Sequence, residues 1–326
     1  MKRVLKIIVA ILAIMVVVIA LGVMVVKFML PRVGSAPDLH VEMTADRIAR
    51  GDYLSNHVMV CIDCHSLRDW ALFSGPPIAG TEGGGGEFFG RELGFPGEIY
   101  SPNITPYGVS DWSDGELFHA ITTGVTPDNK ALFNLMPYLD YGRLDQEDIM
   151  DVIAFIRSLS TLENTIPGRV LDFPVSLIIN TIPKKARLTD RPAVHDRLAY
   201  GEYMFTAAAC KDCHTAYFKG KIIGEYLAGG FAFNMPDGSI LRSTNITPHP
   251  STGIGLWNEA FFVNRFKAYT DTTYVPERIN PGEFQSIMPW IMYGGMTEED
   301  LGAIFTYLQS VPPVDNMVER FTFARR

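Results

Sequence analysis

The longest uninterrupted apolar stretch of this chain lies at its amino terminus. Ile7 to Val26 is a run of 20 residues without a charged side chain, which is long enough to cross a bilayer as a helix. Lys2, Arg3 and Lys6 precede the run. Positive charge on that side predicts that residue 1 stays in the cytoplasm and that the remainder of the chain lies outside the membrane.

A cleaved secretory signal begins with the same charge pattern and is the alternative interpretation. Its apolar core spans about 7–15 residues and ends at a small-X-small site. Val33 to Ala36 offers such a site, whereas Lys27 to Pro31 does not. The length of the apolar run favours an uncleaved transmembrane anchor, residues 1–32. Either interpretation delivers the rest of the chain to the same oxidising compartment.

Apolar residues recur at helical spacing in two later segments. Each segment places four of them on one face: Ile149, Val152, Ile153 and Ile156 in the first, and Leu301, Ile304, Phe305 and Leu308 in the second. The predicted helices begin after Asp145 and Thr297, with acidic residues in the first turn, where they suit the helix dipole. Two further helices are predicted to begin at Ser113, which forms a capping box with Glu116, and near Asn258.

These matched helices belong to a repeat of about 150 residues. Four segments of the first copy recur in the second: 47–53 at 197–203, 61–65 at 210–214, 103–106 at 245–248, and 136–142 at 288–294. The offsets differ by a few residues, as insertions in surface loops would produce. The sequence therefore predicts a mainly α protein with two domains, residues 33–160 and 196–326, behind the amino-terminal helix.

Residues 161–195 join the two copies and lack a helical period. Four prolines interrupt the segment: Pro167, Pro174, Pro183 and Pro192. Its apolar residues between Leu171 and Ile179 are too numerous for a chain hanging free in water. We expect a linker that packs against both domains and holds their relative orientation.

Both copies contain the spacing Cys-X-X-Cys-His. It occurs at residues 61–65 and 210–214, and the two motifs use all four cysteines of the chain. This spacing is the attachment site of a c-type haem, whose porphyrin is bonded by the two thiols and whose iron is bound by the histidine. A thioredoxin-like redox pair or half a zinc site is the alternative. Two complete copies favour two covalently bound haem c groups.

Each haem iron needs a sixth ligand or an open position. Met136 and Met288 lie 71 and 74 residues after the motif histidines, and each precedes a proline and an aromatic residue. The iron ligands are therefore predicted to be His65 with Met136 and His214 with Met288. A thioether ligand saturates the iron and raises its reduction potential relative to a second histidine, which favours electron transfer over oxygen chemistry.

Other residues compete for these roles. Three methionines of the second copy, Met235, Met292 and Met296, lie near Met288 or in a similar Met-Pro pair. Four histidines could also bind iron, but none of them recurs in both copies: His57, His119, His195 and His249. Met288 comes first because it alone occupies the place equivalent to Met136. Trp112 and Trp257 and the repeated Asn103 and Asn245 either contact haem propionates or serve packing and turn formation.

Charge is distributed unevenly along the chain. Five of the 28 basic residues and none of the 36 acidic ones lie in residues 1–32, so the remainder carries 23 basic against 36 acidic side chains, or −13. Such a surface argues against a nucleic-acid partner. It suits solubility, or steering toward a basic electron-transfer partner.

With these motifs in view, residues 47–326 resemble the cytochrome c subunits of bacterial membrane-bound dehydrogenases of the alcohol, gluconate and sorbitol type. Those subunits combine the haem motif with an Asn-Ile-Thr-Pro segment, a tryptophan shortly after it and a late Met-Pro-aromatic ligand. The resemblance implies tandem class I cytochrome c-like domains. It assigns Cys61, Cys64, His65 and Met136 to one haem, and Cys210, Cys213, His214 and Met288 to the other. This chain departs from the pattern in having two haem motifs, where those subunits commonly have three, and an amino-terminal anchor.

These residues predict an electron-transfer protein without substrate chemistry of its own. Electrons would pass from a membrane or periplasmic donor, such as a dehydrogenase, to a respiratory acceptor: an oxidase, a quinone or a soluble cytochrome. The expected location is the bacterial inner membrane, with one membrane pass and the haem domains on the periplasmic side. The alternative is a di-haem cytochrome c peroxidase, which needs one iron with a displaceable ligand and a nearby acid–base group. Two equally dedicated methionines argue against it, and a purely structural subunit is a third hypothesis.

Overall fold

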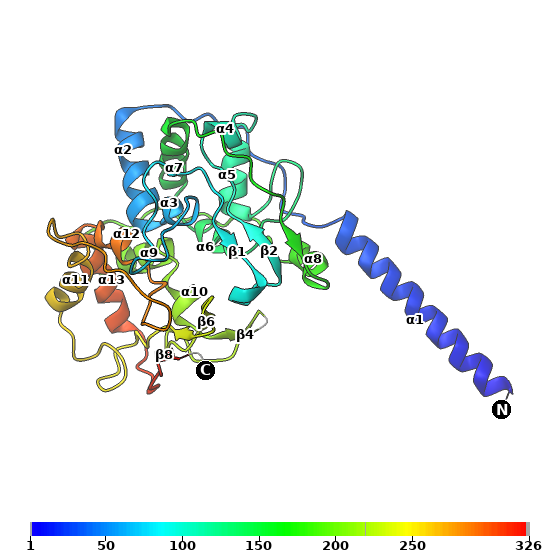
Figure 1. The fold of residues 1–326 in the computed structure, drawn as a ribbon. Helices are drawn as coiled ribbons and strands as arrows, with labels where there is room; N and C mark the ends of the chain where they lie inside the picture. Colours follow the sequence, from blue (N-terminus) through cyan, green and yellow to red (C-terminus); the bar gives the residue numbers. More distant parts are fainter. Residues whose placement is uncertain (1, 219, 324–326) are drawn as a thin grey trace.

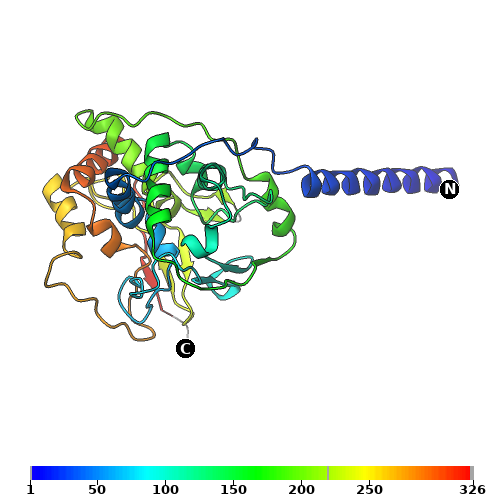
Figure 2. The same ribbon diagram turned by 90° about the horizontal axis from the view of Figure 1, so that it is seen from above.

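The apolar run at the amino terminus forms a helix that projects from the rest of the molecule. The computed structural model describes residues 2–218 and 220–323. Helix α1, Lys2–Phe28, leaves the body on one side, and two views show its exposed length (Figures 1 and 2). Within those described ranges it is the one helix that is long and apolar enough to cross a membrane. The apolar helix is confirmed, and it suits an anchor or a signal sequence equally.

Helices dominate the body, which confirms the mainly α prediction. The first copy contains α2 (Ala45–Tyr53), the π-helical turn η1 (Leu54–Val58), α3 (Cys61–Cys64), α4 (Pro106–Val109), α5 (Asp114–Thr123), α6 (Tyr138–Tyr141) and α7 (Gln146–Ser158). The predicted capping box is present: Glu116 N donates to Ser113 Oγ (3.2 Å), and Ser113 N donates to Glu116 Oε2 (2.7 Å). The start of α5 was therefore predicted correctly from local chemistry.

The second copy repeats this order of helices, without counterparts of η1 and α4 among the described residues. It contains α9 (Arg197–Ala207), α10 (Cys210–His214), α11 (Glu259–Lys267), α12 (Trp290–Gly294) and α13 (Glu298–Ser310). Asn258 caps α11 by accepting from Phe261 N (2.8 Å), and Thr297 caps α13 by accepting from Asp300 N (3.1 Å). All eight apolar residues predicted to form the inner faces of α7 and α13 are buried, so both faces are confirmed.

Short antiparallel strands occupy parts of the loops, and the sequence pattern did not reveal them. They are β1 (Phe88–Phe89), β2 (Gly97–Tyr100), β3 (Val170–Leu171), β4 (Tyr217–Phe218), β5 (Lys221–Ile222), β6 (Ala232–Asn234), β7 (Ile240–Arg242) and β8 (Phe321–Thr322). Among the described residues they form the orders β1-β2-β3, β4-β5 and β6-β7-β8. Strands of two to four residues are too short for an alternating apolar pattern to be recognised.

The opening and closing helices of each copy pack closely at a glycine. A Cβ atom on Gly51 of α2 would lie 1.8 Å from the carbonyl oxygen of Asp151 in α7. A Cβ atom on Gly201 of α9 would lie 2.0 Å from the carbonyl oxygen of Ala303 in α13. The repeated glycine therefore sets the distance between the two helices in both copies.

Equivalent hydrogen bonds cross between the two copies. Tyr53 of α2 donates its hydroxyl to Asp300 of α13, and Tyr203 of α9 donates to Asp148 of α7 (2.6 Å). Tyr53 and Tyr203 occupy equivalent positions of the repeat, as do the two aspartates. Each copy thus offers a tyrosine and an aspartate to the other, which holds the copies in one relative orientation.

The linker contacts the first copy. It contains β3, the short helix α8 (Val175–Ile178) and the 3-10 turn η3 (Ile179–Thr181). Strand β3 pairs with β2, Arg187 N donates to the carbonyl of Gly142 (2.7 Å), and Thr189 Oγ1 donates to that of Arg143 (2.7 Å). We expected the linker to hold the orientation of the copies, but direct contacts such as the two Tyr–Asp pairs connect them.

Candidate haem sites

Each copy contains one cavity beside its Cys-X-X-Cys-His motif. The first, of about 430 Å³, is lined by Cys61, Cys64 and His65 from α3 and by Met136 from the loop before α6. The second, also of about 430 Å³, is lined by Cys210, Cys213, His214 and Met288 in the equivalent places. Both volumes lie in the range of cofactor pockets, and apolar side chains supply most of the walls. The structure therefore brings each predicted set of four residues to one cavity.

The motif histidines are oriented by backbone carbonyls. His65 Nδ1 donates to the carbonyl of Pro102 (2.8 Å), and His214 Nδ1 donates to that of Thr244 (2.8 Å). A carbonyl accepts only, so Nδ1 carries the proton and Nε2 keeps its lone pair for a metal. Burial lowers the pKa of both imidazoles, which favours the neutral form that binds iron. The donor set in each cavity, an imidazole and a thioether, fits a haem.

A glycine in each copy allows the carbonyl that accepts from the motif histidine, that of Pro102 or Thr244, to approach it. Gly85 N donates to the carbonyl of His65 (2.8 Å), and Gly229 N donates to that of His214 (2.8 Å). Both glycines have positive φ, +67° and +74°. A Cβ atom would lie 2.5 Å from the carbonyl carbon of Pro102 in the first copy and 2.4 Å from that of Thr244 in the second. The role of these glycines was not predicted from the sequence; the signal that could have found it is a Gly-Gly pair in both copies, Gly85-Gly86 and Gly229-Gly230.

The thiols do not resemble those of a redox pair. Burial raises the pKa of Cys61 to about 11 and that of Cys64 and Cys210 to about 12. A redox-active Cys-X-X-Cys needs a lowered thiol pKa. Within residues 2–218 and 220–323, no group of three or more His, Cys, Asp or Glu side chains is placed to hold a metal ion. The raised thiol pKa values argue against the redox pair.

Comparison with known proteins agrees with this chemistry. No protein-family model matches the chain. It is 30% identical to the fructose dehydrogenase cytochrome subunit of Gluconobacter japonicus over 282 residues, which cover 81% of this chain and 52% of that subunit. It is 27% identical to the cytochrome c subunit of the quinone alcohol dehydrogenase of Gluconobacter oxydans over 291 residues, covering 82% and 55%. The chain is a homologue of cytochrome c subunits. The resemblance predicted from the motifs is confirmed.

This chain spans about half the length of these dehydrogenase subunits. A relative of similar length also matches: the diheme cytochrome c-type protein of Cereibacter sphaeroides is 25% identical over 300 residues, which cover 87% of this chain and 92% of that protein. These relatives imply covalently bound haem c for this chain. The match to the di-haem protein covers nearly the whole length of both proteins.

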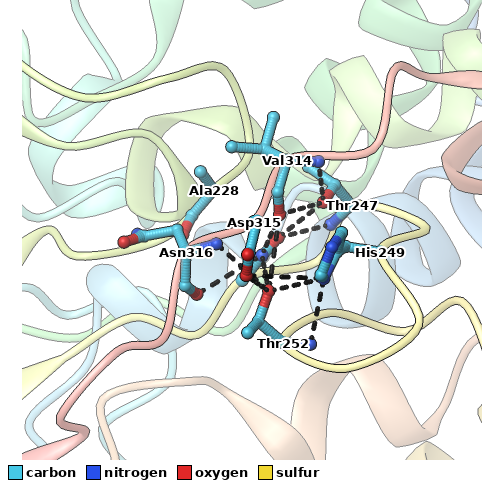
Figure 3. Close-up of polar contacts among 8 residues, drawn as sticks. Ala228, Thr247, His249, Thr252, Val314, Asp315 and Asn316 are labelled. Atoms are coloured by element: carbon cyan, nitrogen blue, oxygen red, sulfur yellow. Dashed lines mark hydrogen bonds and ion pairs between the residues drawn. The ribbon is translucent and has the colours of Figure 1, made fainter.

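The repeated asparagines of this chain, Asn103 and Asn245, form turns. Asn245 Oδ1 accepts from Thr247 N (2.9 Å), and Asn245 Nδ2 donates to the carbonyl of Val314 (2.8 Å). Figure 3 shows Thr247, Thr252 and Val314 gathered in this cluster. Asn103 makes the same bonds with Thr105 N (2.9 Å) and the carbonyl of Leu162 (2.8 Å). These bonds explain the repeated Asn-Ile-Thr-Pro segment as a turn tied to a distant part of the chain, and Asn245 also lines the second cavity.

Several competing ligands lie outside the cavities. The residues that line neither cavity include Met235 and Met292 and the four histidines His57, His119, His195 and His249. Met296 lines the second cavity together with Met288, so it remains the competitor there. Trp257 also lines that cavity, whereas Trp112 does not line the first.

Arginine side chains line both cavities and were not predicted. Arg169 lines the first, and burial lowers the pKa of its guanidinium. Arg265 lines the second, with its guanidinium carbon 4.8 Å from the centroid of the Trp290 ring. Positive charge at these places suits a cofactor with acidic groups. Arg169 belongs to the linker and Arg265 to α11, so the repeat carried no signal for them.

A loop of the first copy holds the methionine segment of the second. Ser74, which is 2% exposed, donates its hydroxyl to the carbonyl of Met288 (2.5 Å), and Ser74 N donates to Gln285 Oε1 (2.8 Å). Gln285 Nε2 donates in return to the carbonyl of Leu72 (2.9 Å). Phe73 of the same loop lines the second cavity. The first copy therefore completes the second site, a role that the sequence did not reveal.

Proposed function

We propose that this chain is a di-haem c-type cytochrome that transfers electrons from a membrane or periplasmic donor to a respiratory acceptor. The observation that carries the proposal is the pair of equivalent cavities, each lined by a Cys-X-X-Cys-His motif and a methionine. The match to a named di-haem cytochrome along 92% of its length supports the count of two. When bound, the haem irons supply one-electron transfer, with potentials raised by methionine ligation.

The residues of each site have separate tasks in this proposal. Cys61 and Cys64 would hold the first haem by thioether bonds, and His65 and Met136 would bind its iron. The second site uses the equivalent residues Cys210, Cys213, His214 and Met288. Carbonyl acceptors keep each imidazole in the tautomer that offers Nε2 to the iron.

We further propose that residues 33–160 and 196–326 are tandem class I cytochrome c-like domains joined by the packed linker 161–195. Five matched helices in the same order, the same glycine contact and the same histidine–carbonyl bond in both copies support this division. Equivalent coordination in both domains favours electron transfer over a peroxidase, which needs one displaceable ligand.

Helix α1 is proposed as an uncleaved anchor in the bacterial inner membrane, with the haem domains on the periplasmic side. Its length and uncharged central run support a single membrane pass. The names of the relatives, which are cytochrome subunits of fructose and alcohol dehydrogenases, support a dehydrogenase as the donor. An oxidase, a quinone or a soluble cytochrome would accept the electrons.

Carbon monoxide binding tests the coordination site by site. The purified full chain should contain two haems by pyridine haemochrome analysis, and its reduced form should bind carbon monoxide at neither iron. Met136→Ala should open the first iron and Met288→Ala the second, so that each variant binds carbon monoxide at half of its haem. Met235→Ala, outside both cavities, should bind none.

Three outcomes would overturn parts of the proposal. A haem count other than two would end the di-haem assignment. Rapid binding of carbon monoxide at either iron of the unchanged protein, together with turnover of hydrogen peroxide, would favour the peroxidase. Opening of the second iron by Met296→Ala instead of Met288→Ala would move the sixth ligand to Met296.

A further inference from the structure

The short helix α8 lies beside the end of α1 at which the chain leaves that helix. Both views place α8 next to this end of α1 (Figures 1 and 2). Asn180 Nδ2, just after α8, donates to the carbonyl of Val26 in the last turns of α1 (3.5 Å). Ile179 is 2% exposed, so the segment is seated firmly against the body. We call residues 172–185 the α8 loop.

The length of α1 gives the level of this contact relative to a bilayer. A helix rises about 1.5 Å per residue, so the uncharged run from Ile7 to Val26 spans about 30 Å, the thickness of the hydrocarbon core. Val26 therefore lies at the boundary between hydrocarbon and headgroups. Because Asn180 contacts Val26, the α8 loop lies at the same boundary.

The α8 loop exposes apolar side chains at this level. Phe173 is 81% exposed and Ile178 is 49% exposed. Single exposed apolar residues are ordinary on protein surfaces, but these two sit where hydrocarbon begins. The one acidic side chain of the loop, Asp172, is paired with Arg91 (2.7 Å). Lys184 and Lys185 are exposed at the other end of the loop, where they suit lipid phosphates.

We propose that the α8 loop inserts Phe173 and Ile178 into the interface of the same bilayer that α1 spans, with Lys184 and Lys185 against the headgroups. This inference rests on the proposed role of α1 as an anchor. A second contact besides α1 would stop the body from swinging on its helix. Ile166, Pro167 and Arg169 line the first cavity, and only the two residues of β3 separate them from the loop, so the first haem site would face the membrane side.

Photo-crosslinking from the bilayer tests this contact without using the haems. The full chain is placed in nanodiscs of phosphatidylcholine and phosphatidylglycerol in which some phosphatidylcholine carries a diazirine on an acyl chain. Trypsin cleaves after Arg169 and Lys184, so the α8 loop is released almost entirely as one peptide, 170–184. The peptide 268–278 contains Val275, which is 77% exposed, and serves as the control in the same digest.

The expected result is lipid adducts on α1 and on 170–184, several-fold above those on 268–278. The double variant Phe173→Ser, Ile178→Ser should lose most of the label on 170–184 and keep the label on α1. Label on α1 with none on 170–184 would overturn the inference and leave the anchor intact. Label on neither would overturn the anchor as well, while haem content would still report on the electron-transfer proposal. Equal label on 170–184 and 268–278 would show a non-specific reaction and refute the contact.

Discussion

At the scale of single residues, the histidines of the two motifs depend on partners that carry no reactive chemistry. Pro102 and Thr244 supply only carbonyl oxygens, and Gly85 and Gly229 supply only the absence of a side chain. The backbone segment that accepts from each imidazole can lie where it does because no Cβ atom stands in the way. The orientation of each motif histidine thus depends on backbone positions.

Replacing Gly85 tests this dependence. Gly85→Ala should push the Pro102 carbonyl away from His65 Nδ1, which weakens the imidazole as a donor to ferric iron, so the potential of the first haem should rise. Gly80→Ala is the matched control, because Gly80 also has positive φ (+85°) but nothing within 4 Å of its Cβ position. Spectroelectrochemical titration of both variants provides the measurement. Equal potentials in the two variants would contradict the positioning role.

At the scale of elements, the helix pairs α2–α7 and α9–α13 are spaced by one glycine each. Gly51 and Gly201 let the backbones approach until a methyl group no longer fits. The buried apolar faces of α7 and α13 provide the driving force for this packing, and the glycines determine how close it becomes. Helix position and helix spacing therefore have different origins.

Gly51→Ala should separate α2 from α7 and destabilise the protein. Overpacking of this kind costs about 1–3 kcal/mol, against which the better helix propensity of alanine recovers less than about 1 kcal/mol. Gly201→Ala should have a similar effect in the second copy. Gly22→Ala, in a helix with nothing within 4 Å of the Cβ position, should leave the unfolding of the body unchanged. Denaturant unfolding of the three variants would refute the prediction if Gly51→Ala and Gly22→Ala behaved alike.

At the scale of the whole molecule, the two copies form one unit rather than two independent ones. The Tyr–Asp pairs run in both directions, but the Ser74 contact runs only from the first copy to the second. The second cavity therefore depends on the first copy, whereas the second copy reaches the Met136 segment at a different place, where Lys211 of α10 pairs with Asp140 of α6. The repeat is close to symmetric in its helices and asymmetric in its sites.

Ser74→Ala tests this asymmetry. Loss of the hydroxyl leaves the Met288 carbonyl without its donor, which costs about 1 kcal/mol and loosens the segment that presents the sulfur. The absorption and potential of the second haem should change while those of the first remain. Ser110→Ala, an exposed serine in the first copy, is the control. The measurement is a redox titration that resolves the two haems, together with the sulfur-to-iron absorption band. Equal shifts in the potentials of both haems would contradict the prediction.

Much of the fold and site was accessible from the sequence because the signals were local. The caps at Ser113, Asn258 and Thr297 are contacts within three residues, and the apolar faces of α7 and α13 repeat within two turns. The haem motifs are likewise contiguous. The assignment of Met136 and Met288 came from the repeat and stays a prediction, although each lies at the cavity of its own motif.

The sequence alone determined where the helices begin and which faces are buried, and it predicts which residues carry haem chemistry, because each of these depends on neighbours along the chain. The tertiary structure decided which carbonyl orients each histidine, which aspartate meets Tyr53 and which serine holds Met288. These contacts join residues as many as 247 positions apart. Periodicity and motif spacing carry no information over that range, since only the packed backbone determines which distant groups meet.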